Sequence, residues 1–429
     1  MYNNIVSYAT PSGQSIRAMQ RRLKVKDGSA WFEYNNKYGD TDIFGSIMRY
    51  IEDASNEISA REAFGARKRE NVKALMDHAT NVEKKMIAEG KPVAKRGLLG
   101  KTALNTFDSI MGFNHTGSST WARLGQAARV AQVVSKLGLS TVTALTDVGF
   151  SFAAATMKGM PILKTARTQL SEIATQGNRK FLSQLGVISD VVLDDVHQAH
   201  RMADVAGNAT SMKIAHAYTR AIGLNRWTKG MKTGHMYQLL AHLTNLKPEK
   251  MTGGMKAALK KYGLDEGALS HLAKAERIKH KGAEFIDPRE ITDRELQANL
   301  LSFLHAETRL AVPEATPRSR AAINWGMAPG TFQGELVRTL GQFKSFPITV
   351  IQSQMATYRT LPTNALRARY LSSLLGGTTV MGGISLWVKD LLNGKEPREI
   401  DAEFAWKSLV HGGAGGPLLD MLAHTGEYG

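Results

Sequence analysis

Three residues with metal-binding side chains, Asp194, His197 and His200, recur at intervals of three. On a helix this spacing places a carboxylate and two imidazoles on one side, which suits a divalent metal. The same pattern is common by chance, and neither a fourth ligand nor a general base lies nearby in the sequence. We therefore interpret these residues as part of a solvated helix face and predict no metal site.

Other catalytic patterns are weaker still. His305, Glu307 and Arg309 stand at alternate positions, which point away from one another on a helix. The chain has no Walker A loop, no GxGxxG after a strand, no GxSxG elbow, no HExxH pair and no cysteine. The sequence thus predicts a non-enzymatic protein without a cofactor.

Basic residues offer a different chemistry. The formal net charge is +17, and such a field attracts polyanions. Nucleic acid, anionic lipid and acidic protein surfaces all fit, and the alternative is that these side chains only solvate helix faces. Clustering favours contact with the phosphates of double-stranded DNA without sequence recognition. The candidate residues are Arg67, Lys68, Arg69, Lys95, Arg96, Lys256, Lys260 and Lys261.

Aromatic residues with basic neighbours could stack on bases. Trp31, Phe32 and Tyr34 form one such group, and Trp227 follows Arg226 in another. Single-strand binders usually present such side chains on the strands of a small barrel, whereas this chain is predicted to be helical. We interpret both groups as core packing.

Helical periodicity outnumbers strand-like alternation along the chain, and aromatics are sparse at 7%. The prediction is an all-α, elongated protein whose helices are rich in small residues. Glycine, proline and charge divide it into a charged helical region (1–100), a central helical core (101–245), a basic connecting segment (246–281) and a helical region (282–429).

Several helices are expected within these regions. They include 43–56, 60–89 and one that starts near Trp121 with a cap from Ser118 to Thr120. The weakly polar stretch 137–160 is long enough to span a bilayer. Asp147 near its middle makes insertion costly, so a buried helix pair is expected.

The stretch 371–388 has eighteen uncharged residues with basic and aromatic flanks, and it is the best membrane candidate. Its glycine pairs, Gly376 with Gly377 and Gly382 with Gly383, would let another helix approach closely. Burial in a soluble core is the alternative, because four glycines weaken a helix. The membrane candidates are Leu371, Leu374, Leu375, Met381, Ile384, Leu386, Trp387 and Val388.

The segment 328–354 combines an amphipathic helix with a proline. Phe332, Leu336, Leu340 and Phe343 recur on one side, with Glu335, Arg338 and Lys344 on the other. Such helices usually bury their apolar side. Pro347 is expected to end or kink the helix.

Four separated motifs resemble a module of large polyvalent phage proteins. They are GSAWFEYNNKYGDT (28–41), the TD pair at 146–147 with GLNRWTKGM (223–231), LAVPEATPRSRAAINWG (310–326) and GQFKSFP (341–347). Proteins that carry this module resemble the internal virion, or ejection, proteins of short-tailed phages. The resemblance implies storage inside the capsid, release into the host periplasm or envelope, and assembly into a conduit for the genome.

The partners implied by the resemblance are further copies of the chain, other ejection, portal or tail proteins, double-stranded DNA and the host membrane. The alternative is a DNA-associated structural module of a polyvalent polypeptide that acts inside the host. The glycine-rich close of the sequence favours a section of a longer polypeptide. The first twenty residues have no apolar signal segment, so delivery outside the cell would need another route.

Overall fold

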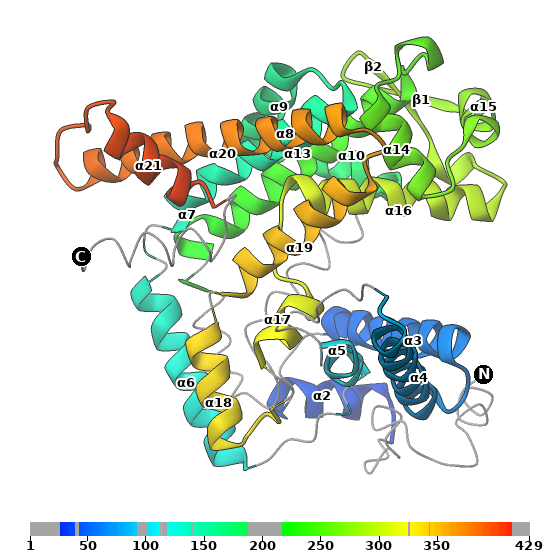
Figure 1. Cartoon of the computed structure of the whole chain (residues 1–429), viewed down its shortest axis with the longest axis vertical. Coiled ribbons are helices and arrows are strands. Elements are labelled where there is room, and N and C mark those ends of the chain that lie inside the picture. Colours follow the sequence, from blue (N-terminus) through cyan, green and yellow to red (C-terminus); the bar gives the residue numbers. More distant parts are fainter. Residues whose placement is uncertain are drawn as a thin grey trace. The chain divides into compact units, whose positions relative to one another are not determined.

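The fold is known from a computed structural model that describes residues 26–38, 43–91, 102–111, 113, 118–136, 138, 140–187, 217–218, 220–324, 327–342 and 344–413. These residues are mostly helical (Figure 1). The strands among them, β1 (Arg277–His280) and β2 (Ala283–Ile286), form one antiparallel hairpin with Arg277 opposite Ile286. The predicted all-α class is confirmed.

The chain divides into two compact units that interleave along the sequence. Unit 1 comprises Met1–Arg129, Val196–Lys213 and Thr316–Gln342, and unit 2 comprises Val130–Asp195, Ile214–Ala315 and Phe343–Gly429. This division differs from the four consecutive regions that we predicted. Glycine, proline and charge mark local breaks, whereas a compact unit is defined by contacts between distant segments.

Unit 1 is made of helices of 8 to 22 residues. Its helices are α2 (Gly28–Tyr38), α3 (Ile43–Phe64), α4 (Lys68–Ala88), α5 (Thr102–Met111), the first part of α6 (Ser119–Lys136), α17 (Pro317–Asn324) and α18 (Phe332–Gly341). Helix α5 contacts both α4 and α17, and the rings of Phe64 and Phe107 meet edge to face. The helix expected over 60–89 is divided because Gly65 adopts a left-handed conformation with φ +74°. The Ser118 hydroxyl accepts a hydrogen bond from Thr120 N at the start of α6, as expected.

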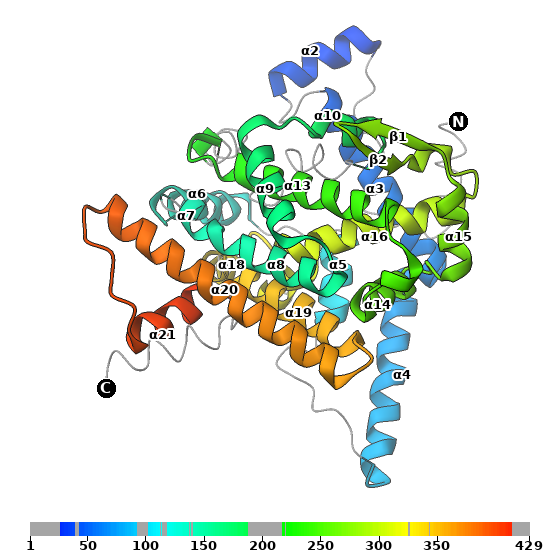
Figure 2. The same cartoon turned by 90° about the horizontal axis from the view of Figure 1, so that it is seen from above.

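Unit 2 is built around one buried helix, α13 (Leu224–Thr244). Helix α13 packs closely against α9 (Ile162–Thr175) and contacts α16 (Arg294–Ala311), while α20 (Asn364–Leu392) crosses α8 (Asp147–Lys158) and α21 (Ala402–His411) (Figure 2). The remaining elements are α7 (Ser140–Thr143), η1 (Ala144–Thr146), α10 (Arg179–Gln184), η2 (Pro248–Lys250), α14 (Gly253–Lys261), α15 (Glu266–Lys274), η3 (Pro288–Glu290) and α19 (Ser345–Thr360). Glycines make the closest crossings possible. A Cβ on Gly234 would lie 2.5 Å from the Gln169 Cα on α9.

The structure of unit 2 differs from two predictions, for the stretch 137–160 and for the segment 246–281. The stretch 137–160 contains a single long buried helix, α8, preceded by α7 and η1 instead of an equal partner helix. The segment 246–281, predicted as a connection, instead belongs to the core. Met255, Leu259, Leu264 and Leu272 are all almost completely buried in the largest apolar cluster. Their apolar spacing outweighs the many lysines, which remain on the outer side.

The break near Pro347 lies earlier than predicted. Helix α18 ends at Gly341, α19 begins at Ser345, and Pro347 occupies the first turn of α19. Proline is tolerated there because the amide protons of a first turn have no partner within the helix. The break also coincides with the boundary between the two units.

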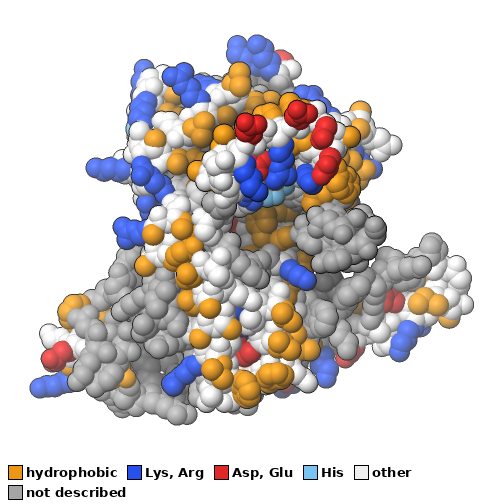
Figure 3. All heavy atoms as spheres, turned by 90° about the vertical axis from the view of Figure 1, so that its left-hand side faces the viewer, with side chains coloured by type: hydrophobic (Ala, Val, Ile, Leu, Met, Phe, Trp, Pro, Cys, Tyr) orange, Lys and Arg blue, Asp and Glu red, His pale blue; other side chains and the backbone are white. Residues whose placement is uncertain are grey.

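The predicted orientation of α18 is wrong, because its charged side is buried and its apolar side is exposed. Glu335 and Arg338 are only 4% and 7% exposed, whereas Phe332 and Leu340 are 57% and 67% exposed. Hydrophobic side chains gather on the face that carries α6 and α18 (Figure 3). Phe343 lies outside the described residues.

Candidate functional site

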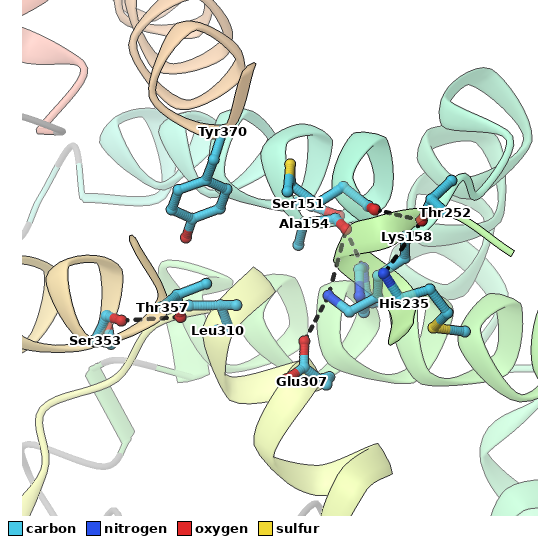
Figure 4. A network of polar contacts seen from close by, with 12 residues as sticks. Ser151, Ala154, Lys158, His235, Thr252, Glu307, Leu310, Ser353, Thr357 and Tyr370 are labelled. Atoms are coloured by element: carbon cyan, nitrogen blue, oxygen red, sulfur yellow. Dashed lines mark hydrogen bonds and ion pairs between the residues drawn. The ribbon is translucent and has the colours of Figure 1, made fainter. Parts of the chain in front are cut away.

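Helices α8 and α16 bury a charged pair inside unit 2 (Figure 4). Lys158 Nζ, at the end of α8, and Glu307 Oε2 on α16 lie 2.6 Å apart, and both side chains are more than nine-tenths buried. Lys158 also donates to the carbonyl oxygen of Ala154, 3.3 Å away. A cation is favoured at the carboxyl end of a helix, where unpaired carbonyl groups concentrate negative charge. The attraction between the two charges therefore offsets the free-energy cost of removing each of them from water.

A narrow pocket with about 30 Å³ of free space lies beside this pair, lined in part by Lys158, Glu307, Thr357 and Tyr370. This volume suits a water molecule, whereas pockets for organic ligands usually hold about 300 Å³ or more. The Tyr370 hydroxyl donates to Gln354 Oε1, and burial raises the pKa of Tyr370, so the hydroxyl stays protonated at neutral pH. The pocket is thus a small polar gap between packed helices, and not a site for an organic ligand.

A second polar group links α8, α9 and α13. Ser151 Oγ lies 3.0 Å from His235 Nδ1 and accepts a hydrogen bond from Gln169 Nε2 at 2.9 Å. Burial, with the nearby charge of Lys158, lowers the pKa of His235 to about 3, so the imidazole is neutral in the folded protein. A serine beside a neutral imidazole is the pairing used in nucleophilic catalysis. Here both side chains are fully buried, so the contact joins helices and offers no surface for a substrate.

A third buried group lies near the start of α8. Burial raises the pKa of Asp147 to about 7, and the negative charge of Glu314 adds to the shift, while Trp227 opposes it. Glu314 itself pairs with Lys232 on α13, with 2.8 Å between Oε1 and Nζ. Asp147 therefore binds a proton in the folded state under conditions in which an exposed aspartate is ionised.

We predict that Asp147 makes stability depend on pH. Because its folded pKa of about 7 exceeds the ordinary value of 3.8, its contribution is fully present below about pH 4. It is lost as the pH rises through about 7. Replacing Asp147 by Asn should therefore stabilise the protein relative to wild type at pH 8 by on the order of 2 kcal/mol more than at pH 5.

Thermal unfolding of both proteins at several pH values between 5 and 8 measures this difference. His235 has the opposite pH dependence, but it is present in both proteins and cancels from the comparison. A stability difference that does not change with pH would show that Asp147 titrates normally.

The predicted DNA contacts in unit 1 differ in exposure. Arg67 is exposed and only loosely paired with Glu70, at 3.9 Å. Arg69 Nε lies 2.8 Å from Asp108 Oδ1, on an arginine side chain that is 55% exposed. Lys68 does not fit the prediction, since its side chain is 7% exposed and its ammonium pairs with Glu57 at 2.5 Å. Lys95 and Arg96 lie outside the described residues.

The predicted DNA contacts in unit 2 are more accessible than those in unit 1. Lys256, Lys260 and Lys261 are all exposed on α14, a helix of nine residues that contains no acidic side chain. Further exposed basic residues follow at Lys274 and Lys279. Sequence reasoning therefore found a set of neighbouring, accessible cations here.

The membrane candidates all lie on α20, the one helix in the described part of the chain that is long and apolar enough to cross a bilayer. Leu374 is buried, Leu371 and Ile384 are exposed, and Leu375, Met381, Leu386, Trp387 and Val388 are half-buried. Added Cβ atoms on Gly377 and Gly382 would contact α8 and α21, whereas one on Gly376 meets nothing. In this structure α20 is a packed helix with one apolar outer side.

The other residues considered as sites have structural surroundings or cannot be placed. Trp227 and Lys229 are buried, and Arg226 donates to the carbonyl oxygens of Ile173 and Ala174. Asp194, His197 and His200 lie outside the described residues. Within the part that is described, no group of three or more His, Cys, Asp or Glu is placed to hold a metal ion.

Sequence reasoning missed the roles of Lys158, Ser151 and His235, because their partners lie tens of residues away or more. One signal was present in α13, where two lysines, two histidines and two glycines occur on several sides of one helix. When a helix carries polar residues on several sides, burying it requires polar partners from other helices.

Comparison of the chain with protein-family models, with curated proteins and with solved structures gives no match. The resemblance to phage virion proteins is therefore carried by the four sequence motifs alone.

Proposed function

We propose that this chain is a non-enzymatic, self-assembling protein that binds the backbone of double-stranded DNA, as an internal virion protein of a short-tailed phage would. The observation that carries this proposal is the lysine surface of α14, formed by Lys256, Lys260 and Lys261. All three side chains are exposed on a helix without acidic residues. Lysine side chains contact phosphate as flexible point charges, which gives affinity without sequence recognition.

The charge of the whole chain supports the same proposal. A net charge of +17 draws a polyanion toward the protein before any specific contact forms, and this attraction weakens as salt rises. Met255 and Leu259 anchor the inner side of α14 in the core, so the lysines project from a fixed helix. Because the helix backbone is already fixed, binding through these lysines costs less backbone freedom than binding through charges on a loose segment.

Contact with a membrane, also part of the proposal, would use the outer side of α20. Val380, Ile384 and Leu391 are exposed there and follow helical spacing. Peripheral contact through this side would leave the α8 and α21 crossings intact, whereas complete insertion would have to open them. In the proposed setting the protein is held in the capsid and released into the host envelope.

Replacing Lys256, Lys260 and Lys261 together by Gln should weaken binding to duplex DNA by about 10- to 100-fold at low salt. The dependence of log affinity on log salt should become shallower by about 2 to 3, since about one counterion is released per phosphate contact. Two duplexes of unrelated sequence should be affected equally. Fluorescence anisotropy over a range of salt concentrations measures both quantities.

The matched control replaces Lys344, Lys395 and Lys407 by Gln, which removes the same charge from other parts of unit 2. If both triple variants lose the same affinity, total charge and not the α14 surface governs binding. If the wild-type protein shows no salt-sensitive binding, the DNA part of the proposal is wrong.

A further inference from the structure

Helix α18 buries its charges against α6 instead of exposing them. Glu335 Oε2 lies 2.6 Å from Arg129 Nη1 on α6, and both side chains are more than nine-tenths buried. Gly330 N donates to the other carboxylate oxygen at 2.8 Å, and Arg338 donates to the Met327 carbonyl oxygen at 3.2 Å. Buried, well-paired charges fix the rotation of α18 about its axis, because turning it would leave them without partners.

The consequence is an apolar outer surface on this helix pair (Figure 3). We call it the α6–α18 face, formed by Trp121, Leu124, Phe332, Leu336 and Leu340, all of them at least 43% exposed. The rings of Trp121 and Phe332 meet edge to face with 5.2 Å between centroids. The two helices therefore present one joined surface within unit 1.

We propose that the α6–α18 face is the surface through which one copy of this chain binds a second copy. The inference rests on the proposed function, which requires self-assembly, and it names where the contact forms. The exposed apolar side chains of the face amount to on the order of 500 Å², so two copies would bury about 1,000 Å². That area is close to the smallest that specific protein interfaces use, and it predicts an affinity in the micromolar range.

The distribution of charge favours contact between like copies at this face. Two chains that each carry +17 repel each other over most of their surfaces. The exposed side of α18 carries no charge, because both of its ionic residues are buried. Copies can therefore approach along α18 without bringing like charges together, and Arg123 is the exposed basic residue beside Trp121 and Leu124 on α6.

The same features argue against lipid as the occupant. Helices that lie on membranes usually carry lysine or arginine along their polar side, where they meet anionic headgroups. On α18 the single basic residue, Arg338, points inward and is 7% exposed. With ten residues α18 is about 15 Å long, half the thickness of the hydrocarbon core.

Analytical ultracentrifugation across a concentration series tests the proposal with the full chain. Replacing Leu336 and Leu340 by Gln should raise the dimer Kd by at least 10-fold. Both leucines are exposed, so the unfolding temperature should stay near that of wild type. Leu163→Gln is the matched control, because Leu163 is 85% exposed on α9 in unit 2 and should leave the Kd unchanged.

Cross-linking gives a second measurement, since the chain has no cysteine of its own. Leu340→Cys should form a disulfide-linked dimer under mild oxidation at least 10-fold faster than Leu163→Cys. Equal rates, or a wild-type protein that remains monomeric at tens of micromolar, would overturn the proposal. A monomer that sediments with anionic vesicles through Leu336 and Leu340 would also overturn it, in favour of lipid.

These outcomes are separable from a failure of the proposed function. The α14 triple variant should dimerise like wild type, and the Leu336 and Leu340 double variant should still bind DNA in a salt-sensitive way at concentrations below the dimer Kd. A wild-type protein that does not bind DNA would contradict the proposed DNA-binding function, but it would not contradict dimerisation through the α6–α18 face.

Discussion

Replacing Glu307 by Leu should lower the free energy of unfolding of unit 2 by about 3 to 5 kcal/mol, because it leaves the Lys158 ammonium buried without its counter-ion. The pair joins α8 to α16 at 2.6 Å, with 3% and 8% of the two side chains exposed. The pocket that adjoins the pair has about 30 Å³ of free space, room for about one water molecule, so it solvates the remaining charge poorly.

The double variant Lys158→Met and Glu307→Leu should recover most of the loss. A buried ion pair that is exchanged for apolar residues of similar volume is often neutral in its effect on stability. Urea unfolding followed by circular dichroism gives the free energies, and the double-variant cycle gives the coupling between the two residues.

The control is Glu403→Leu, which removes the partner of Lys407 on α21, where both side chains are largely exposed. A solvated pair of this kind contributes less than about 1 kcal/mol. If Glu307→Leu is as mild as Glu403→Leu, the Lys158–Glu307 pair between α8 and α16 is solvated and not buried.

Replacing Gly149 by Ala should destabilise unit 2 by about 3 kcal/mol through a clash between α8 and α20. A Cβ at this position would lie 2.7 Å from both the amide nitrogen and the Cα of Thr378. These are backbone atoms of a long helix, so the helices must separate and weaken the packing of Phe150 and Leu374 between them.

Gly376→Ala is the matched control, since it makes the same chemical change on α20. A Cβ there meets nothing within 4 Å, and alanine favours a helix over glycine by about 1 kcal/mol. This variant should be neutral or slightly stabilised in the same urea experiment. Equal destabilisation by both changes would mean that glycine is needed for flexibility in α20, and not for close approach to α8.

Several features of the fold could be predicted from the sequence because they depend on near neighbours. The apolar periodicity predicted an all-α protein, and the serine before Trp121 predicted where α6 begins. The glycine pairs in 371–388 predicted close helix crossings, which Gly377 and Gly382 make. The lysines of α14 are exposed, and their contact with DNA stays a prediction. In each case the signal and its consequence lie within a few residues.

The buried sites could not be predicted in this way. Ser151 and His235 are 84 residues apart, and Lys158 meets a glutamate 149 positions later in the sequence. The basic cluster predicted that Lys68 faces solvent, but its side chain is buried in an ion pair with Glu57. A charged side chain is usually buried only beside a partner of opposite sign. Residue spacing in the sequence does not show which distant residue is that partner.

The sequence by itself determined that α18 has one apolar and one charged side, since that follows from the rotation of about 100° per residue. Only the tertiary structure decided which side faces the protein. Arg129, 206 residues before Glu335, supplies the buried counter-charge that turns the ionic side inward. Helical amphipathicity is a local property, whereas the choice of the buried side depends on the total free energy of the contacts that distant segments provide.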